Sequence, residues 1–209
     1  LLKDKKHMTK NVALLVGGWS AERQVSLTKG KFVEDALREA GYNVNVIDVK
    51  KDLSLLVEAL TPKPDVVFNN LHGRGGEDGE IQSLLEILEI PYTHSGVTAS
   101  AIGMNKALTR KLAQSVGIQC PLGQVNTAQD AFKQTDIAKP YIVKPVCEGS
   151  SVGVYIVREG DNRKIENLGY ENLCDDLLVE QYIPGKELTV AVLDGKAQGV
   201  TEIVSQTGF

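Results

Sequence analysis

A short segment in the middle of the chain combines a lysine with small residues in a pattern suited to holding a phosphate. The apolar run 141–143 ends at Lys144, and the segment 148–153 reads Glu-Gly-Ser-Ser-Val-Gly. Glycines let the backbone approach a ligand closely, and successive N–H groups can form an anion-binding concavity. The lysine ammonium would point to the same place. An ordinary glycine-rich hairpin is the alternative, and the lysine and the paired serines argue against it.

Two common nucleotide-binding patterns are missing from the sequence. No Gly-Lys-Ser/Thr follows a strand and opens a helix, and no G-x-G-x-x-G occurs. If a nucleotide binds, it binds by another scheme.

Two further loops carry ionisable side chains, and each follows an apolar run. The run 11–16 leads into Gly-Gly-Trp-Ser-Ala-Glu, and the run 65–68 leads to a loop that bears His72 among four glycines. Ser20 is expected to cap the next helix, with Glu22 in its first turn. Ligands of parallel α/β sheets sit beyond the carboxyl ends of the strands. We therefore expect Glu22 and His72 to face one crevice.

Glu180 and Glu187 lie on either side of a Pro-Gly turn near the end of the chain. A strand edge offers backbone N–H and C=O groups that suit an adenine ring, and a carboxylate there can accept from an amino group or a ribose hydroxyl. Solvated surface carboxylates are the alternative.

The elements that must position these loops follow from hydrophobic periodicity. Strands alternate with helices in the first half, which predicts an α/β fold with a doubly wound parallel sheet. Asp194-Gly195 is a strong signal for a two-residue hairpin turn. The predicted strands are 11–16, 44–47, 65–68, 123–125, 141–143, 152–157, 177–181, 187–193 and 197–205. The predicted helices are 25–40, 53–60, 81–88, 106–116 and 128–135, with a connection or short helix over 95–101.

Composition limits the class of protein. The chain has 209 residues, 42% of them hydrophobic and 24% charged, which is typical of a globular protein. A net charge of −4 gives no electrostatic reason for binding nucleic acid or a membrane surface, and no run of 18 apolar residues occurs. Three cysteines without a C-x-x-C argue against a disulfide framework and a zinc site, so we expect reduced thiols in the cytoplasm.

Taken together, five segments resemble the D-alanine–D-alanine ligase family of the ATP-grasp superfamily. The resemblance runs from about residue 11 to the last residue. It rests on segments 17–26, 71–79, 104–106, 144–153 and 180–187, which follow one another in the family's order. It implies a tail at 1–9, an α/β domain at 10–103, a central ATP-grasp lobe at 104–184, and the start of a second ATP-grasp lobe from 185, so that the ATP-grasp α+β region is incomplete.

The resemblance implies an ATP-dependent ligase that joins two D-alanines for peptidoglycan precursor synthesis. ATP phosphorylates the first carboxylate, the amine of the second D-alanine attacks the acyl phosphate, and phosphate leaves. Phosphoryl transfer depends mainly on positioning and charge stabilisation. Glu22 and Ser150 are the implied catalytic residues. Glu22 would pair with the ammonium of the first D-alanine, with His72 and Ser150 close to that substrate.

The family also implies how the nucleotide is held. Lys106 and Lys144 would bind the ATP phosphates, and the loop 148–153 would close over them. The implied cofactor-binding residues are Lys106, Lys144, Glu148, Ser150, Ser151, Glu180, Gln181, Ile183 and Glu187. Among these, Glu180 and the backbone of 181–183 would hold adenine and Glu187 the ribose.

The sequence departs from the family in two respects. Gln181 stands where the family often has lysine, so a side-chain cation is lost there while a backbone contact is kept. The sequence also stops at Phe209. In the family, the ligands of two Mg²⁺ (or Mn²⁺) ions lie beyond the corresponding point, so no metal ligand is expected here. We expect a chain that ends there to be inactive as a ligase and to bind ATP weakly.

Two other functions stay open. Another ATP-grasp ligase, for example one that makes D-alanyl-D-lactate, would share these motifs, and a non-catalytic nucleotide-binding module would need only some of them. Glu22 followed by Arg23 favours the dipeptide ligase, and Glu22, His72 and Lys106 together argue against a pure nucleotide binder. The family implies a homodimer.

Overall fold

A computed structural model describes residues 9–127, 130–131, 135–161 and 176–204. The chain separates into two compact units: the first is Leu1–Ile118 with Val146–Val152, and the second is Gln119–Pro145 with Gly153–Phe209. Residues 1–8 of the predicted tail, most of the predicted helix 128–135, and Cys174 lie outside the described residues. The three-part domain division stays a prediction.

The first unit is built on a parallel sheet of order β2-β1-β3, with β1 in the centre. The chain passes from β1 to β2 on one side and then crosses to β3 on the other. This reversal of direction is the topological switch point of a doubly wound sheet. The strands are β1 (Asn11–Gly17), β2 (Asn43–Val49) and β3 (Val66–Asn69), and the helices around them are α1 (Arg23–Glu39), α2 (Leu53–Ala59) and α3 (Glu80–Ile87).

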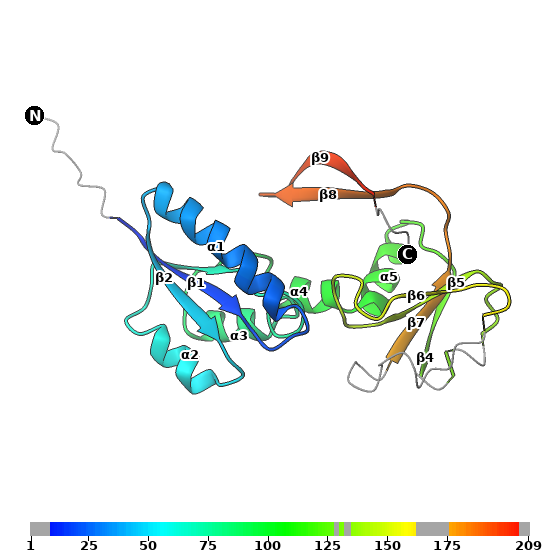
Figure 1. The fold of residues 1–209 in the computed structure, drawn as a ribbon, viewed down its shortest axis with the longest axis horizontal. Coiled ribbons are helices and arrows are strands. Elements are labelled where there is room, and N and C mark those ends of the chain that lie inside the picture. Colours follow the sequence, from blue (N-terminus) through cyan, green and yellow to red (C-terminus); the bar gives the residue numbers. More distant parts are fainter. Residues whose placement is uncertain (1–8, 128–129, 132–134, 162–175, 205–209) are drawn as a thin grey trace, which may run out of the picture. The chain divides into compact units, whose positions relative to one another are not determined.

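Helices cover both faces of this sheet (Figure 1). Leu14 and Val16 of β1 pack against Leu27, Val33 and Leu37 of α1. The alternate β1 side chains point to the opposite face because successive residues of a strand point to opposite sides.

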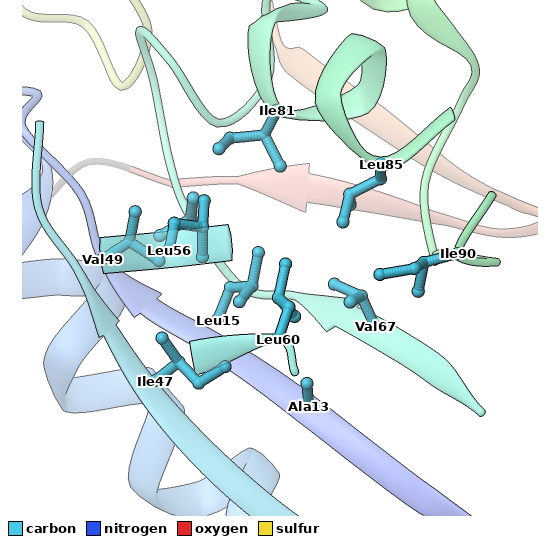
Figure 2. Packing of buried hydrophobic residues seen from close by; sticks show 11 residues of the cluster. Ala13, Leu15, Ile47, Val49, Leu56, Leu60, Val67, Ile81, Leu85 and Ile90 are labelled. Carbon is cyan, nitrogen blue, oxygen red and sulfur yellow. The ribbon is translucent and has the colours of Figure 1, made fainter. Parts of the chain in front are cut away.

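On that opposite face, Leu15 of β1 packs with side chains from α2 and α3 (Figure 2). Leu56 and Leu60 come from α2 and its end, and Ile81 and Leu85 come from α3. Trp19, the single tryptophan of the chain, packs against the same cluster. The predicted doubly wound fold is therefore confirmed.

The ends of α1 show one confirmed and one wrong prediction. Gly41 stops the helix as expected: its φ is 88°, and the N–H of Tyr42 donates to the carbonyl of Leu37 over 3.1 Å. Ser20 does not cap the helix. The N-cap residue is Glu22, one residue before the helix rather than in its first turn. The hydroxyl of Ser20 instead bonds to the backbone of His72 and of Glu22.

Two further helices follow in the first unit. They are α4 (Val97–Met104) and α5 (Lys106–Ser115). Asn105 lies between them in an extended conformation, and its side chain accepts the N–H of Leu108 at the start of α5. A capping asparagine thus separates two helices at the point where the sequence pattern loosens.

The second unit contains an antiparallel sheet of order β4-β7-β5-β6. Alternate residues of β5, Tyr141 and Val143, are buried with Leu177 and Val179 of β7. Lys144 and Glu180 lie on the other face of these strands. The strands are β4 (Gly123–Thr127), β5 (Tyr141–Pro145), β6 (Tyr155–Val157) and β7 (Asp176–Gln181).

The predicted strand 152–157 is too long at its start. Ser150, Ser151 and Gly153 have φ values of 46°, 58° and 70°, and a strand cannot contain such left-handed residues. The N–H of Val152 instead closes a turn on the carbonyl of Gly149 over 3.0 Å. Of the predicted strand 152–157, only Tyr155–Val157 pairs with β5.

The last described strands form the predicted hairpin. They are β8 (Glu187–Leu193) and β9 (Lys196–Ile203), paired antiparallel. Asp194 and Gly195 both have positive φ, 49° and 69°, as the two central residues of a type I′ turn require.

Within the described ranges, no helix has both the length and the apolar character needed to cross a membrane.

Removal of a core side chain should destabilise the first unit far more than removal of a larger exposed one. Leu85 is fully buried, whereas Phe32 is 72% exposed. We expect Leu85→Ala to lower the free energy of unfolding by about 2–5 kcal/mol through lost burial and a cavity, and Phe32→Ala by less than about 0.5 kcal/mol. Urea unfolding followed by Trp19 fluorescence measures both, and equal losses would contradict the core described here.

Candidate functional site

The loops after β1 and β3 lie next to each other because these strands are neighbours in the sheet. The loop after β1 is fixed by Arg23, whose guanidinium binds Asp48 of β2 through two N–H groups at 2.8 and 2.9 Å. The same guanidinium donates to the carbonyl of Gly18 over 3.1 Å. A side chain at Gly17 would collide with Arg23 and Asp48, so the glycine is needed there.

This ion pair has an electrostatic consequence. The hydrogen bond from Arg23, helped by Lys50, lowers the pKa of Asp48 from its ordinary value to about 2. Asp48 is therefore ionised across the physiological range and holds the start of α1 in place.

Glu22 lies at the centre of the site and is only 5% exposed. The hydroxyl of Ser150 donates to its Oε2. Its Oε1 is buried and has no hydrogen-bond partner among the described residues. A Cβ at Gly73 would lie 2.8 Å from this oxygen, and one at Gly149 would lie 2.6 Å from it. Two glycines therefore leave the room in which the carboxylate sits.

His72 follows β3 on the glycine-rich loop. Its Nδ1 lies 3.7 Å from Glu77 Oε1, and Glu77 Oε2 accepts the N–H of Gly73 over 2.7 Å. Its Nε2 is buried and has no hydrogen-bond partner in the described part of the chain. Buried polar atoms are nearly always satisfied. The open atoms on Glu22 and His72 therefore indicate a polar ligand, and the carboxylate favours one that is positively charged.

The inner side of this loop is held by two buried amides. The side chains of Asn69 and Gln82 both donate to the carbonyl of Gly76 over 2.8 Å, and both residues are fully buried. These two amide contacts were not predicted from the sequence. The signal was available, because Gln82 is a polar residue next to Ile81 in a helix that is otherwise apolar on its inner face.

The segment Val146–Val152 belongs to the first unit. The backbone N–H of Lys106 donates to the carbonyl of Val146 over 3.0 Å, and its ammonium donates to the carbonyl of Glu148. Lys106 thus holds this segment where Ser150 meets Glu22. Ser151 is exposed.

The second unit carries the other predicted phosphate ligand. The ammonium of Lys144 pairs with the carboxylate of Glu180, which is 6% exposed. Register explains the contact: Lys144 is opposite Leu178 and Ile142 is opposite Glu180, so the two side chains are diagonal neighbours on one face.

The backbone N–H groups of residues 181–183 differ in whether they have an acceptor. The N–H of Gln181 donates to Leu122 over 2.8 Å, and that of Tyr182 donates to Pro140 over 3.4 Å. The N–H of Ile183 makes no hydrogen bond to the residues that the structure describes. The side chains of Gln181 and Glu187 are exposed.

The predicted site residues thus fall into two groups. Glu22, His72, Lys106, Glu148 and Ser150 come together in the first unit. The second unit contains Lys144, Glu180, Gln181, Ile183 and Glu187. In the described ranges, no group of three or more His, Cys, Asp or Glu side chains could hold a metal ion.

A parallel α/β unit with a carboxylate at its switch point, followed by an antiparallel unit with a lysine–glutamate pair, is typical of ATP-grasp enzymes. Solved structures support this class. A D-alanine–D-alanine ligase from Bacillus anthracis has a TM-score of 0.79 and 30% identity, over 93% of this chain and 64% of that one. The same enzyme complexed with ATP has a TM-score of 0.78 and 29% identity, over 96% of this chain and 68% of that one.

Sequence comparisons identify the family. The profile described as D-ala D-ala ligase C-terminus matches residues 118–209, and the one described as D-ala D-ala ligase N-terminus matches residues 54–95. D-alanine–D-alanine ligases from Granulibacter bethesdensis and Parvibaculum lavamentivorans are each 50% identical, over 200 and 202 residues. The chain belongs to the D-alanine–D-alanine ligase family. In both alignments the matched region makes up 96% of this chain and 65% of the relative.

The room beside Glu22 leads to a testable prediction about Gly149. Gly149→Ala should lower the free energy of unfolding by about 1–3 kcal/mol, because the new methyl group collides with a buried carboxylate. The control is Gly103→Ala in α4, where an added Cβ meets nothing within 4 Å. We expect that variant to gain up to about 1 kcal/mol from helix propensity. Urea unfolding of both variants checks the difference, and a stable Gly149→Ala would contradict the geometry.

The Arg23–Asp48 pair should make stability depend on acid pH. The pKa of Asp48 is lower in the folded chain than in the unfolded chain, so its contribution is complete above about pH 4 and is lost as the pH falls toward 2. The pair is partly exposed, so we expect no more than about 1 kcal/mol. Asp48→Asn should remove this part of the acid dependence, and Asp35→Asn on the exposed side of α1 should leave it. Unfolding curves at pH 7, 4 and 2.5 measure the difference.

Proposed function

We propose that the protein containing this chain joins two D-alanines in an ATP-dependent reaction for peptidoglycan precursor synthesis. The observation that supports this most directly is the buried Glu22 carboxylate, which has one open oxygen and lies in the same loop cluster as the open nitrogen of His72. An amino acid ammonium is a ligand of the right charge with N–H donors for these atoms. The names of the relatives supply the particular amino acid.

The reaction proceeds through an acyl phosphate. An oxygen of the first D-alanine carboxylate attacks the γ-phosphorus of ATP, and ADP leaves. The amine of the second D-alanine attacks the acyl carbon and loses a proton, and phosphate leaves with the C–O electron pair. In this scheme Glu22 holds the ammonium of the first D-alanine, and Ser150 fixes the carboxylate by donating to its second oxygen.

We assign the phosphates of ATP to Lys106 and Lys144. Each ammonium binds an acceptor of the chain: Lys106 binds the carbonyl of Glu148, and Lys144 binds the carboxylate of Glu180. A lysine ammonium has three donors, so each can keep that contact and still donate to a phosphate oxygen. The present contacts orient both side chains before the nucleotide arrives, which lowers the entropy lost on binding.

The open N–H of Ile183 is suited to a ring nitrogen of adenine, and Glu187 at the start of β8 is suited to the ribose hydroxyls. Gln181 would take part through its carbonyl, since its N–H is already used. Glu148, Ser150 and Ser151 would close over the phosphates as part of the glycine- and serine-containing loop 148–153. These assignments extend the ATP complex of the relative from Bacillus anthracis to this chain.

Mg²⁺ or Mn²⁺ would neutralise phosphate charge during transfer, and the family places its ligands in the part of the sequence that this chain does not cover. We also propose a cytoplasmic location and a homodimer, both from the family. Size-exclusion chromatography with light scattering tests the dimer.

Substitution of Lys144 tests the proposed function and the phosphate site together. In D-alanine-dependent ADP release by the full protein, Lys144→Ala should lower kcat/KM about a thousandfold, because it removes a cation that stabilises the transferred phosphate. Lys139→Ala is the control, since Lys139 is exposed and precedes β5. Equal losses would mean that the phosphate site is misplaced. ADP release that requires D-lactate, or ATP binding without a D-alanine effect, would support the alternative functions instead.

A further inference from the structure

The hydroxyl of Ser20 joins the two loops that carry the open polar atoms. It donates to the carbonyl of His72 over 2.7 Å and accepts the N–H of Glu22 over 3.1 Å. A serine hydroxyl has one proton and two lone pairs, so it can make both bonds at once. Ser20 therefore connects the backbone of Glu22 directly to the backbone of His72, although 52 positions separate it from His72.

Ser20 is also closely packed against the loop after β3. A Cβ at Gly73 would lie 3.1 Å from the Ser20 hydroxyl and 3.2 Å from its Cβ, so the loop after β3 lies close against the serine and leaves little room for a side chain at position 73. Glu22 is the N-cap residue of α1, and its own side chain makes no capping hydrogen bond to the helix. Its own carboxylate is bonded to Ser150. Ser20 is thus the side-chain contact that fixes the Glu22 backbone.

We propose that Ser20 is a positioning residue for the first D-alanine. It holds the open oxygen of Glu22 and the open nitrogen of His72 at a fixed separation, without contacting the substrate itself. This inference rests on the proposed function for the identity of the ligand, and on the structure alone for the bridge. Small displacements in such sites reduce binding and rate because the reacting groups must be held closely.

Ser26 provides a matched control. Its hydroxyl accepts the N–H of Gly17 over 2.9 Å and donates to the carbonyl of Asn70 over 2.6 Å. It therefore makes the same kind of bridge between the ends of β1 and β3, and it is fully buried. The two partners of its hydroxyl carry no substrate-binding side chain, and the bond from its backbone N–H to the carbonyl of Glu22 does not depend on the hydroxyl. Loss of the Ser26 hydroxyl thus measures what such a bridge contributes to stability alone.

The kinetic test uses the full protein and D-alanine-dependent ADP release. Ser20→Ala should raise the KM for the first D-alanine about tenfold while the KM for ATP stays within about twofold. Ser26→Ala should lower the urea concentration at the unfolding midpoint and leave the D-alanine KM near that of the wild type. An unchanged D-alanine KM in Ser20→Ala, or equal changes in both substrates, would overturn the proposal. Ser20→Cys, whose thiol is a weak donor and acceptor, should give an intermediate KM.

An NMR measurement tests the bridge without any assumption about the reaction. In Ser20→Ala the amide proton of Glu22 should exchange faster with solvent and the carbonyl ¹³C shift of His72 should change, whereas Ser26→Ala should affect neither. If the wild type shows no D-alanine-dependent turnover, the proposed function fails, and the NMR result decides on the bridge alone. Unchanged Glu22 exchange would overturn the bridge even if the enzyme is active.

Discussion

The main constraint on the first unit is the carboxylate of Glu22. It is nearly buried, and one of its two oxygens makes no hydrogen bond to the described residues. Burial of an ionised group is unfavourable unless partners replace the lost water. Glu22 has Ser150 on one oxygen, the positive end of the α1 dipole beside it, and an open second oxygen. The open oxygen therefore indicates a polar ligand, and the glycines at positions 73 and 149 leave the space that the carboxylate itself occupies.

The topology explains why the carboxylate lies there. Since β2 and β3 flank β1, the chain leaves β1 toward one side and leaves β3 toward the other. Loops that depart in opposite directions leave space between them, and this space receives the side chains that follow each strand. The Arg23–Asp48 pair fixes the loop after β1. The amides of Asn69 and Gln82 fix the loop after β3. The site is therefore supported by residues that never need to contact the substrate.

Much of the fold followed from local signals. Alternating apolar runs predicted the parallel sheet, Gly41 marked the end of α1, and Asp194-Gly195 marked the hairpin of β8 and β9. Each of these signals acts within one turn or one strand. The two wrong predictions have different causes, since one is a contact with a distant segment and the other is a local turn. A serine before a helix normally caps it, but Ser20 bonds to His72, and the apolar start of 152–157 is displaced by left-handed residues that close a turn.

The sequence alone determined which residue types are present and in what order, and that was enough to indicate a phosphate-binding lysine, an ammonium-pairing carboxylate and the family resemblance. Only the tertiary structure decided which of them meet. Ser150 reaches Glu22 across 128 positions, and Lys144 reaches Glu180 through the register of β5 and β7. The physical reason is that side-chain contacts between distant segments depend on strand order and register, which the whole core sets, whereas helix ends and tight turns are set by the few residues that form them.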